Sequence, residues 1–155
     1  MRDKSPLSKD FKVNEPTKNT EILFQEIKEA TNIYSFLKNN TDLHLKPTLA
    51  SYIQQLLKEK DIKKSKLLYD TGLSRSFLYA VLKSEKTPSR NSLIKLIFGM
   101  NASLPESYNL LNYAGYQPLY AKDLRDTILI FGLKQKMSLP RVNDILYDLN
   151  IEIID

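Results

Sequence analysis

A glycine at position 72 separates two short segments of helical periodicity, and this pattern constrains the possible folds more than any other feature of the chain. The apolar residues at helical spacing on its two sides are Leu67, Leu68, Leu78, Val81 and Leu82. Glycine readily takes the left-handed conformation that ends a helix, and Ser74 can cap the helix that follows. The sequence therefore predicts a short helix over about 64–69, a tight turn, and a second helix over 75–82.

Helical periodicity also runs through most of the remaining chain. Apolar residues at helical spacing predict a leading helix over 20–38, capped by Thr20. Thr48 can cap the next helix, and Ser89 opens another, whose apolar residues lie at 93–97. No alternating strand pattern of useful length precedes the terminal Ile-Glu-Ile-Ile-Asp, so the fold class is predicted to be all-α.

The C-terminal third contains an internal echo. The segment FGMNASLPESYNLLNYAGYQPL begins at Phe98, and FGLKQKMSLPRVNDILYDLNIEII begins at Phe131. Each copy continues from Phe-Gly through a polar link to Ser-Leu-Pro, where the serine can cap a helix with proline in its first turn. The echo predicts two successive helical hairpins that stack on each other, and the second hairpin extends the central domain.

Positive charge is concentrated in one third of the chain. Residues 46–100 hold 11 Lys and Arg against 4 Asp and Glu, a balance of +7, whereas the rest of the chain has a balance of −2. A local basic field attracts polyanions. Such a field also serves solubility, so charge alone leaves both interpretations open.

Several classes of protein are excluded by what the sequence lacks. No apolar run is long enough to span a bilayer, and the charged N-terminus is unlike a secretory signal. The chain has no cysteine, its only histidine is His44, and its four glycines lie in different segments. We therefore expect a cytoplasmic protein that is not an enzyme and has no metal site, no cofactor and no membrane partner.

The two short helices and their turn follow the order of a helix–turn–helix unit, in which the second helix presents its N-terminal half to the DNA major groove. The residues predicted to face outward and read bases are Ser74, Arg75, Ser76, Tyr79 and Lys83. Serine and arginine can hydrogen-bond to base edges, and arginine pairs well with guanine. Two alternatives remain open: Arg75 as a phosphate contact or exposed charge, and Tyr79 packed against a neighbouring helix.

The same stretch carries a known residue pattern. It comprises Lys63-Lys64-Ser65-Lys66-Leu67-Leu68, Gly72-Leu73-Ser74, Arg75-Ser76-Phe77-Leu78-Tyr79, Lys83-Ser84-Glu85-Lys86-Thr87-Pro88-Ser89 and Leu93-Ile94-Lys95-Leu96. These residues resemble the Cro/lambda-repressor-like (XRE) helix–turn–helix family. The resemblance implies a five-helix DNA-binding domain. The sequence departs from the family pattern at Leu68, where a small residue is usual, and at Leu82, where an acidic residue is usual.

The resemblance also implies which residues hold the DNA backbone. It places Lys64, Lys86 and Arg90 where the family contacts phosphates. We assign the adjacent Lys63 the same phosphate-binding role. The alternative for Lys63 and Lys64 is that they form part of a solvated helix face.

The flanking segments resemble a narrower group of XRE-type proteins from Gram-positive bacteria that carry extra N- and C-terminal helices. The matching residues are Leu110-Leu111-Asn112-Tyr113-Ala114-Gly115-Tyr116-Gln117-Pro118-Leu119-Tyr120, Arg125-Asp126 and Val142-Asn143-Asp144-Ile145-Leu146. The expected organisation is a disordered tail over 1–19, a leading helix and link over 20–45, a helix–turn–helix domain over 46–118, and a helical hairpin extension over 119–155.

Two functions follow from this interpretation. The first is a homodimeric regulator of transcription, most simply a repressor, that binds double-stranded DNA. Such a protein would be associated with the nucleoid in the cytoplasm. The leading helix, the C-terminal extension, or both can supply the dimer surface. The second is a protein-interaction module, such as an antitoxin or an adaptor, that keeps the fold and binds a protein partner through its flanking helices.

Overall fold

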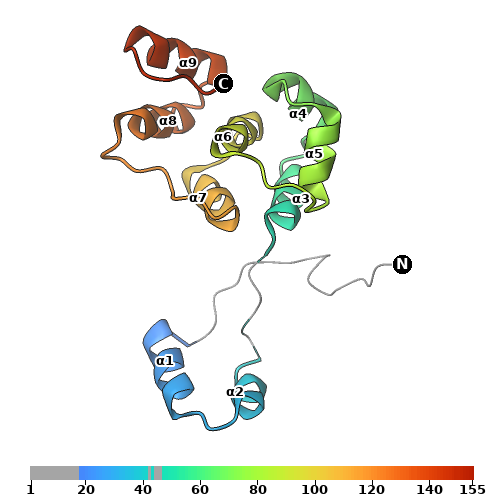
Figure 1. The fold of residues 1–155 in the computed structure, drawn as a ribbon, viewed down its shortest axis with the longest axis vertical. Coiled ribbons are helices and arrows are strands. Elements are labelled where there is room, and N and C mark those ends of the chain that lie inside the picture. The colour runs from blue at the N-terminus through green and yellow to red at the C-terminus, as the bar shows by residue number, and fades with distance from the viewer. Residues whose placement is uncertain (1–17, 42, 44–46) are drawn as a thin grey trace. The chain divides into compact units, whose positions relative to one another are not determined.

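A computed structural model describes residues 18–41, 43 and 47–155 (Figure 1). Within these residues the chain forms nine α-helices and no strand, which confirms the predicted all-α class. None of the described helices is long and apolar enough to cross a membrane. The chain divides into two compact units, residues 1–47 and 48–155. Nearly all of the tail expected to be disordered, 1–17, lies outside the described residues.

The first unit holds α1 (Thr20–Glu29) and α2 (Ile33–Asn39), where one continuous leading helix was predicted. That prediction is wrong because the side chain of Asn32 accepts a hydrogen bond from the backbone N–H of Tyr34 and starts a new helix. The cap of α1 also differs from the prediction. Asn19, not Thr20, accepts from the Ile22 N–H at 2.9 Å.

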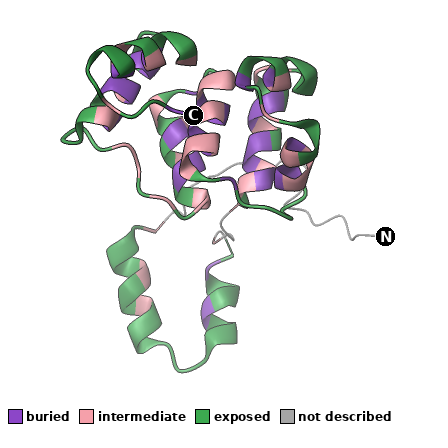
Figure 2. Ribbon diagram, turned by 45° about the horizontal axis from the view of Figure 1, so that its top comes forward, coloured by how far each residue is buried: buried purple, intermediate pink, exposed green. Residues whose placement is uncertain are grey.

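Few side chains are buried in this first unit (Figure 2). Phe36 and Asn40 are its buried residues among those described. The large apolar residues that remain exposed on α1 and α2 are Ile22, Phe24, Ile27, Ile33, Tyr34 and Leu37. The two helices therefore have little hydrophobic core of their own.

The second unit begins with five helices around one core. They are α3 (Leu49–Glu59), α4 (Lys64–Thr71), α5 (Arg75–Leu82), α6 (Arg90–Gly99) and α7 (Leu104–Tyr113). Helix α3 packs against α5 and α7, while α6 packs against α4 and α7. The fully buried side chains at the centre include Ile53, Leu56, Leu67, Leu78, Leu93, Leu96, Leu110 and Leu111. Their burial supplies most of the favourable free energy of folding in this part of the chain.

The predicted echo forms two helical hairpins, α6–α7 and α8–α9, where α8 spans Leu124–Lys134 and α9 spans Leu139–Asp148. Ser103 and Ser138 cap the second helix of each hairpin, with proline in the first turn, as predicted. Helix α9 contacts α6, and α8 contacts α7. A second buried cluster joins Ile94 of α6 to Leu129, Val142 and other residues of the C-terminal hairpin. The extension is therefore packed onto the five-helix core.

Each Phe-Gly pair of the echo places its glycine at a close helix contact. A Cβ atom added to Gly99 would lie 2.6 Å from Cγ2 of Thr71 in α4. A Cβ atom added to Gly132 would lie 2.5 Å from Cγ2 of Val142 in α9. Both distances are shorter than van der Waals contact. Glycine at these positions lets the paired helices approach each other closely.

Six of the described helices, α3, α5, α6, α7, α8 and α9, end in the same way. In each, a residue with positive φ follows the C-cap, and the next residue donates its N–H to a carbonyl five residues earlier. This pair of features defines the Schellman motif. The residues with positive φ are Asp61, Ser84, Asn101, Gly115, Lys136 and Asn150, so only α7 uses glycine.

The last residues, 151–155, lie outside any helix and are fixed by side chains from the C-terminal hairpin. The amide of Asn143 accepts from the N–H of Ile154 at 2.8 Å and donates to its carbonyl at 2.9 Å. Arg125 donates to the carbonyls of Glu152 and Ile153, both at 2.8 Å. The side chain of Ile154 is buried in the second cluster. The terminal segment is thus part of the packed unit.

Candidate nucleic-acid interface

The turn between α4 and α5 has the geometry that the sequence predicted. Gly72 has φ 69° and donates its N–H to the carbonyl of Leu68 at 2.9 Å. Ser74 then caps α5 by accepting from the N–H of Phe77 at 3.1 Å. The predicted bounds of α5, 75–82, are confirmed, and α4 extends two residues beyond the predicted end at 69.

Buried residues and one long-range hydrogen bond fix the orientation of α5. Leu78 and Val81 are almost completely buried, and Leu67 of α4 lies in the same cluster. The side chain of Gln54 in α3 donates to the carbonyl of Leu82 at 3.0 Å. Since α5 is only eight residues long, this tertiary packing determines which of its faces points outward.

The predicted base-reading residues are distributed along α5, from its N-cap to its C-cap. Ser74, Arg75 and Ser76 are exposed at its beginning, and the hydroxyls of the two serines lie 3.3 Å apart. Lys83 is exposed at its C-cap. Tyr79 is half-buried, with its ring facing a lysine of the preceding helix. The N-terminus of α5 therefore presents hydrogen-bond donors and a positive charge.

Three of the four predicted phosphate-binding residues lie in the segments before and after α5. Lys63, Lys64 and Lys86 are exposed. The ammonium of Lys64 lies 5.2 Å from the ring centroid of Tyr79. The ammonium of Lys86 lies 5.0 Å from the ring centroid of Phe77. Both distances are within the range of cation–π interactions.

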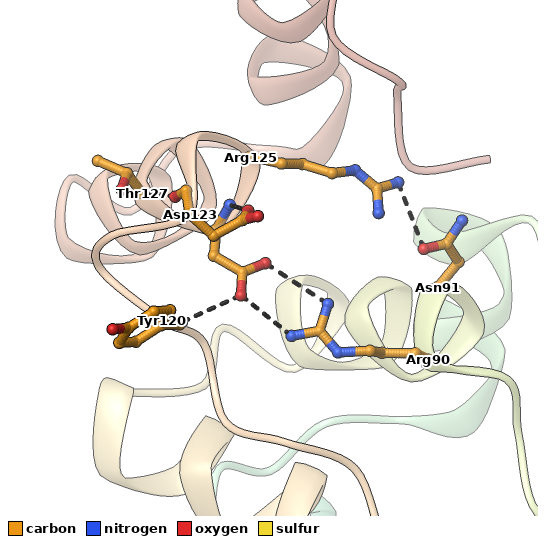
Figure 3. A network of polar contacts seen from close by, with 7 residues as sticks. Arg90, Asn91, Tyr120, Asp123, Arg125 and Thr127 are labelled. Carbon is orange, nitrogen blue, oxygen red and sulfur yellow. Dashed lines mark hydrogen bonds and ion pairs between the residues drawn. The ribbon is translucent and has the colours of Figure 1, made fainter.

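The fourth residue, Arg90, is engaged elsewhere (Figure 3). Its guanidinium donates to both carboxylate oxygens of Asp126, at 3.2 and 3.5 Å. Asp126 is buried in the first turn of α8 and also accepts from the N–H of Tyr120 at 3.0 Å. The phosphate role of Arg90 remains a prediction, and the described structure gives its charge an internal partner.

A neighbouring contact joins the same two helices. Arg125, next to Asp126 in α8, donates to the side-chain oxygen of Asn91 at 3.3 Å, in addition to the terminal carbonyls (Figure 3). Arg125 and Asp126 therefore bind different partners and not each other. Together they attach the start of α6, which follows the loop that carries Lys86, to the C-terminal hairpin.

Sequence reasoning assigned no role to Phe77, and the structure places it beneath Lys86. The available signal was its position on the helix, two residues before Tyr79 and beside the outward face. That signal is weak because an aromatic residue in a short helix is usually a core residue. Elsewhere in the described residues, no three His, Cys, Asp or Glu side chains come together, and His44 lies outside these residues.

No family model matches this chain, and no curated protein or solved structure was found to be similar to it.

Proposed function

We propose that this protein is a sequence-specific regulator of transcription, acting as a repressor, that inserts α5 into the major groove of double-stranded DNA. The observation that carries the proposal is the exposed beginning of α5, formed by Ser74, Arg75 and Ser76. Lys64 and Lys86 each lie over an aromatic ring of the same helix. Arginine and serine at the start of a helix are suited to hydrogen bonding with base edges in that groove.

The charge distribution supports a polyanionic partner. The positive balance of residues 46–100 is centred on the segments that surround α5. Lys63, Lys64, Lys83 and Lys86 are exposed there, and among them Lys64 and Lys86 lie over aromatic rings. Each lysine that neutralises a phosphate releases counterions and so strengthens binding at low salt.

The order of the helices supports the same function. Helices α3 to α7 enclose one core, and α4 and α5 are joined by a turn with a left-handed glycine. The resemblance of residues 46–118 to the XRE helix–turn–helix family is a further support for the proposal. Under this proposal the protein works in the cytoplasm, in association with the nucleoid.

A single helix in one groove reads few base pairs, so the proposal includes a homodimer that reads a pseudo-palindromic site. The exposed apolar residues of α1 and α2 are available for such an interface. The C-terminal hairpin also exposes large apolar side chains, including Leu124, Phe131, Tyr147 and Leu149. Either surface can supply the dimer contact.

The same exposed residues favour a second candidate function, a protein-interaction module of the antitoxin or adaptor type. Contiguous apolar surface on flanking helices commonly marks a protein-binding site. In this candidate the partner covers α1 and α2 or the C-terminal hairpin, and Arg75 has no role in binding.

One selection experiment separates the two candidates. The purified chain is used to select duplexes from a random-sequence pool, and binding of the selected duplex is then compared for the wild type and Arg75→Ala. We expect the variant to lose about 1–3 kcal/mol of binding free energy for the selected duplex. Arg141→Ala is the matched control, because Arg141 is also exposed in the first turn of a serine-capped helix.

Two results would contradict the proposal. If no sequence is enriched and the wild type fails to bind any duplex at low salt, the interaction module becomes the better candidate. If a sequence is enriched but Arg75→Ala binds it as tightly as Arg141→Ala does, Arg75 is not a base-reading residue.

A further inference from the structure

Both aromatic residues of α5 lie beneath a lysine that comes from another segment. Phe77 is covered by Lys86 of the loop that follows α5, and Tyr79 is covered by Lys64 in the first turn of α4. One of the two lysines therefore precedes α5 in the sequence, and the other follows it. Within the described part of the chain, neither lysine forms an ion pair, whereas nearby Lys66 pairs with Asp70 at 2.8 Å.

The two rings lie on opposite flanks of the helix. Successive residues of an α-helix are rotated by about 100°, so positions 77 and 79 are about 200° apart. The core-facing direction of α5 is marked by Leu78, Val81 and Leu82, all of which are buried. Relative to that direction, Phe77 and Tyr79 each lie about a quarter turn away, on different sides.

The surface between the two rings is the outward face of α5. Ser76, Ala80 and Lys83 lie there by the same rotation, and Ser76 and Lys83 are exposed. The outward face therefore has a lysine on an aromatic ring along each of its long edges. A helix in the major groove, which is about 12 Å wide, has a phosphate backbone on each side.

We infer that Phe77 and Tyr79 are positioning residues, which hold Lys86 and Lys64 on opposite flanks of α5 so that each ammonium meets one of the two backbones. The inference rests on the proposed function, because it specifies how the same surface grips DNA. A lysine side chain has many rotamers, and contact with a phosphate restricts them. A ring that already holds the ammonium reduces this loss on binding.

The inference changes the role assigned to Tyr79. As a base reader, Tyr79 would act through its hydroxyl group. As a positioning residue, it acts through its ring. Tyr79→Phe separates these roles, since it keeps the ring and removes the hydroxyl. We expect Tyr79→Phe to bind DNA like the wild type and Tyr79→Leu to bind more weakly.

The decisive test is a double-mutant cycle on Phe77 and Lys86. Binding of a fluorescein-labelled 24-base-pair duplex is measured from 50 to 200 mM salt for the wild type, Phe77→Leu, Lys86→Ala and the double variant. We expect Phe77→Leu to weaken binding about 2- to 5-fold without changing the salt dependence. Lys86→Ala should lower the log–log salt slope by about 0.9. In the Lys86→Ala background, Phe77→Leu should cause no further loss.

The cycle also covers the possibility that Phe77→Leu disturbs folding, since Phe77 packs partly against the core. A purely structural role would weaken binding by the same factor in both backgrounds, and that result would overturn the inference. An unchanged affinity of Phe77→Leu would overturn it as well, while leaving the proposed function intact. Failure of the wild type to bind the duplex even at 50 mM salt would overturn the proposed function, and the inference with it.

Discussion

The guanidinium of Arg90 lies 3.2 Å from the carboxylate of Asp126, and this ion pair joins the first residue of α6 to the first turn of α8. Asp126 is 7% exposed, so its charge is largely removed from water. A buried carboxylate is tolerated when a cation and hydrogen-bond donors surround it, and here Arg90 and the N–H of Tyr120 fill those roles.

Replacement of Arg90 tests both its internal role and its predicted phosphate contact. Arg90→Met leaves the Asp126 charge buried without its cation, and we expect the free energy of unfolding to fall by about 2–4 kcal/mol. The salt slope of DNA binding should not change, because the guanidinium is held by Asp126. Urea denaturation and fluorescence binding titrations measure the two effects.

The control for this prediction is the double variant Arg90→Met/Asp126→Ala. It removes both charges and should be more stable than Arg90→Met alone. A fall in the salt slope of Arg90→Met by about 1 would instead show that Arg90 contacts a phosphate in the complex.

Glu106 gives a prediction for pH dependence. Its carboxylate accepts from the N–H of Ser103 at 2.8 Å and lies 2.9 Å from the ammonium of Lys60. Burial opposes its ionisation, but the Ser103 N–H and Lys60 outweigh burial, so the pKa of Glu106 lies below its ordinary value of 4.5. A carboxyl whose pKa is lowered by folding stabilises the folded state above the unfolded pKa, and this effect is lost as the pH falls through the folded pKa.

We therefore expect Glu106→Gln to be less stable than the wild type at pH 7 by about 1 kcal/mol, because the charged contacts are lost. The difference should shrink as the pH falls below 4.5, the ordinary pKa value of the group. Urea denaturation of both proteins at pH 7, 5 and 3 measures it. A difference that stays constant across this range would show that the charge of Glu106 contributes nothing.

The glycines of the Phe-Gly pairs should not tolerate alanine. Alanine favours an exposed helix by about 1 kcal/mol over glycine. At Gly132, however, the new methyl group would collide with Val142, which is completely buried. We expect Gly132→Ala to lower the free energy of unfolding by about 1–3 kcal/mol, as measured by thermal and urea denaturation.

A compensating change checks the cause of that loss. Val142→Ala removes the methyl group that the new Cβ would meet, so Gly132→Ala should cost less in the Val142→Ala background than in the wild type. Equal costs in the two backgrounds would mean that the collision with Val142 is not the reason.

Asn143 should hold the terminal segment in place. Asn143→Ala removes two hydrogen bonds to Ile154, and we expect a loss of about 1–3 kcal/mol in the free energy of unfolding. Amide hydrogen exchange at Ile154 should speed up strongly. Asn112→Ala, at an exposed position of α7, is the matched control. Unchanged exchange at Ile154 in Asn143→Ala would show that the segment is held by other contacts.

The elements that could be predicted from the sequence are those set by local signals. Gly72 and Ser74 act within one turn of the chain, so the end of α4 and the bounds of α5 were close to the prediction. Ser103 and Ser138, each followed by Leu-Pro, marked the starts of α7 and α9 for the same reason. The candidate DNA-binding surface was found through these helices.

The features that could not be predicted depend on residues far apart in the sequence or on small local preferences. Arg90 and Asp126 are separated by 36 positions, and no local sequence pattern indicates that they form an ion pair. The break between α1 and α2 results from competition between continued helical periodicity and a cap at Asn32, which periodicity alone does not resolve. The contact between Lys86 and the ring of Phe77 depends on the conformation of the loop that carries Lys86, which the sequence pattern does not specify.

The Schellman motifs imply that some positions of the chain accept amino-acid substitutions during evolution more readily than others. Their hydrogen bonds run between main-chain groups, and the five non-glycine residues with positive φ are all exposed. Side chains at 61, 84, 101, 136 and 150 can therefore vary while the helix ends stay where they are, and glycine there would relieve strain. Gly99 and Gly132 have no such freedom, because the space beside them is already occupied. Among distant descendants of this sequence, the two Phe-Gly pairs should outlast the loop residues that separate the helices.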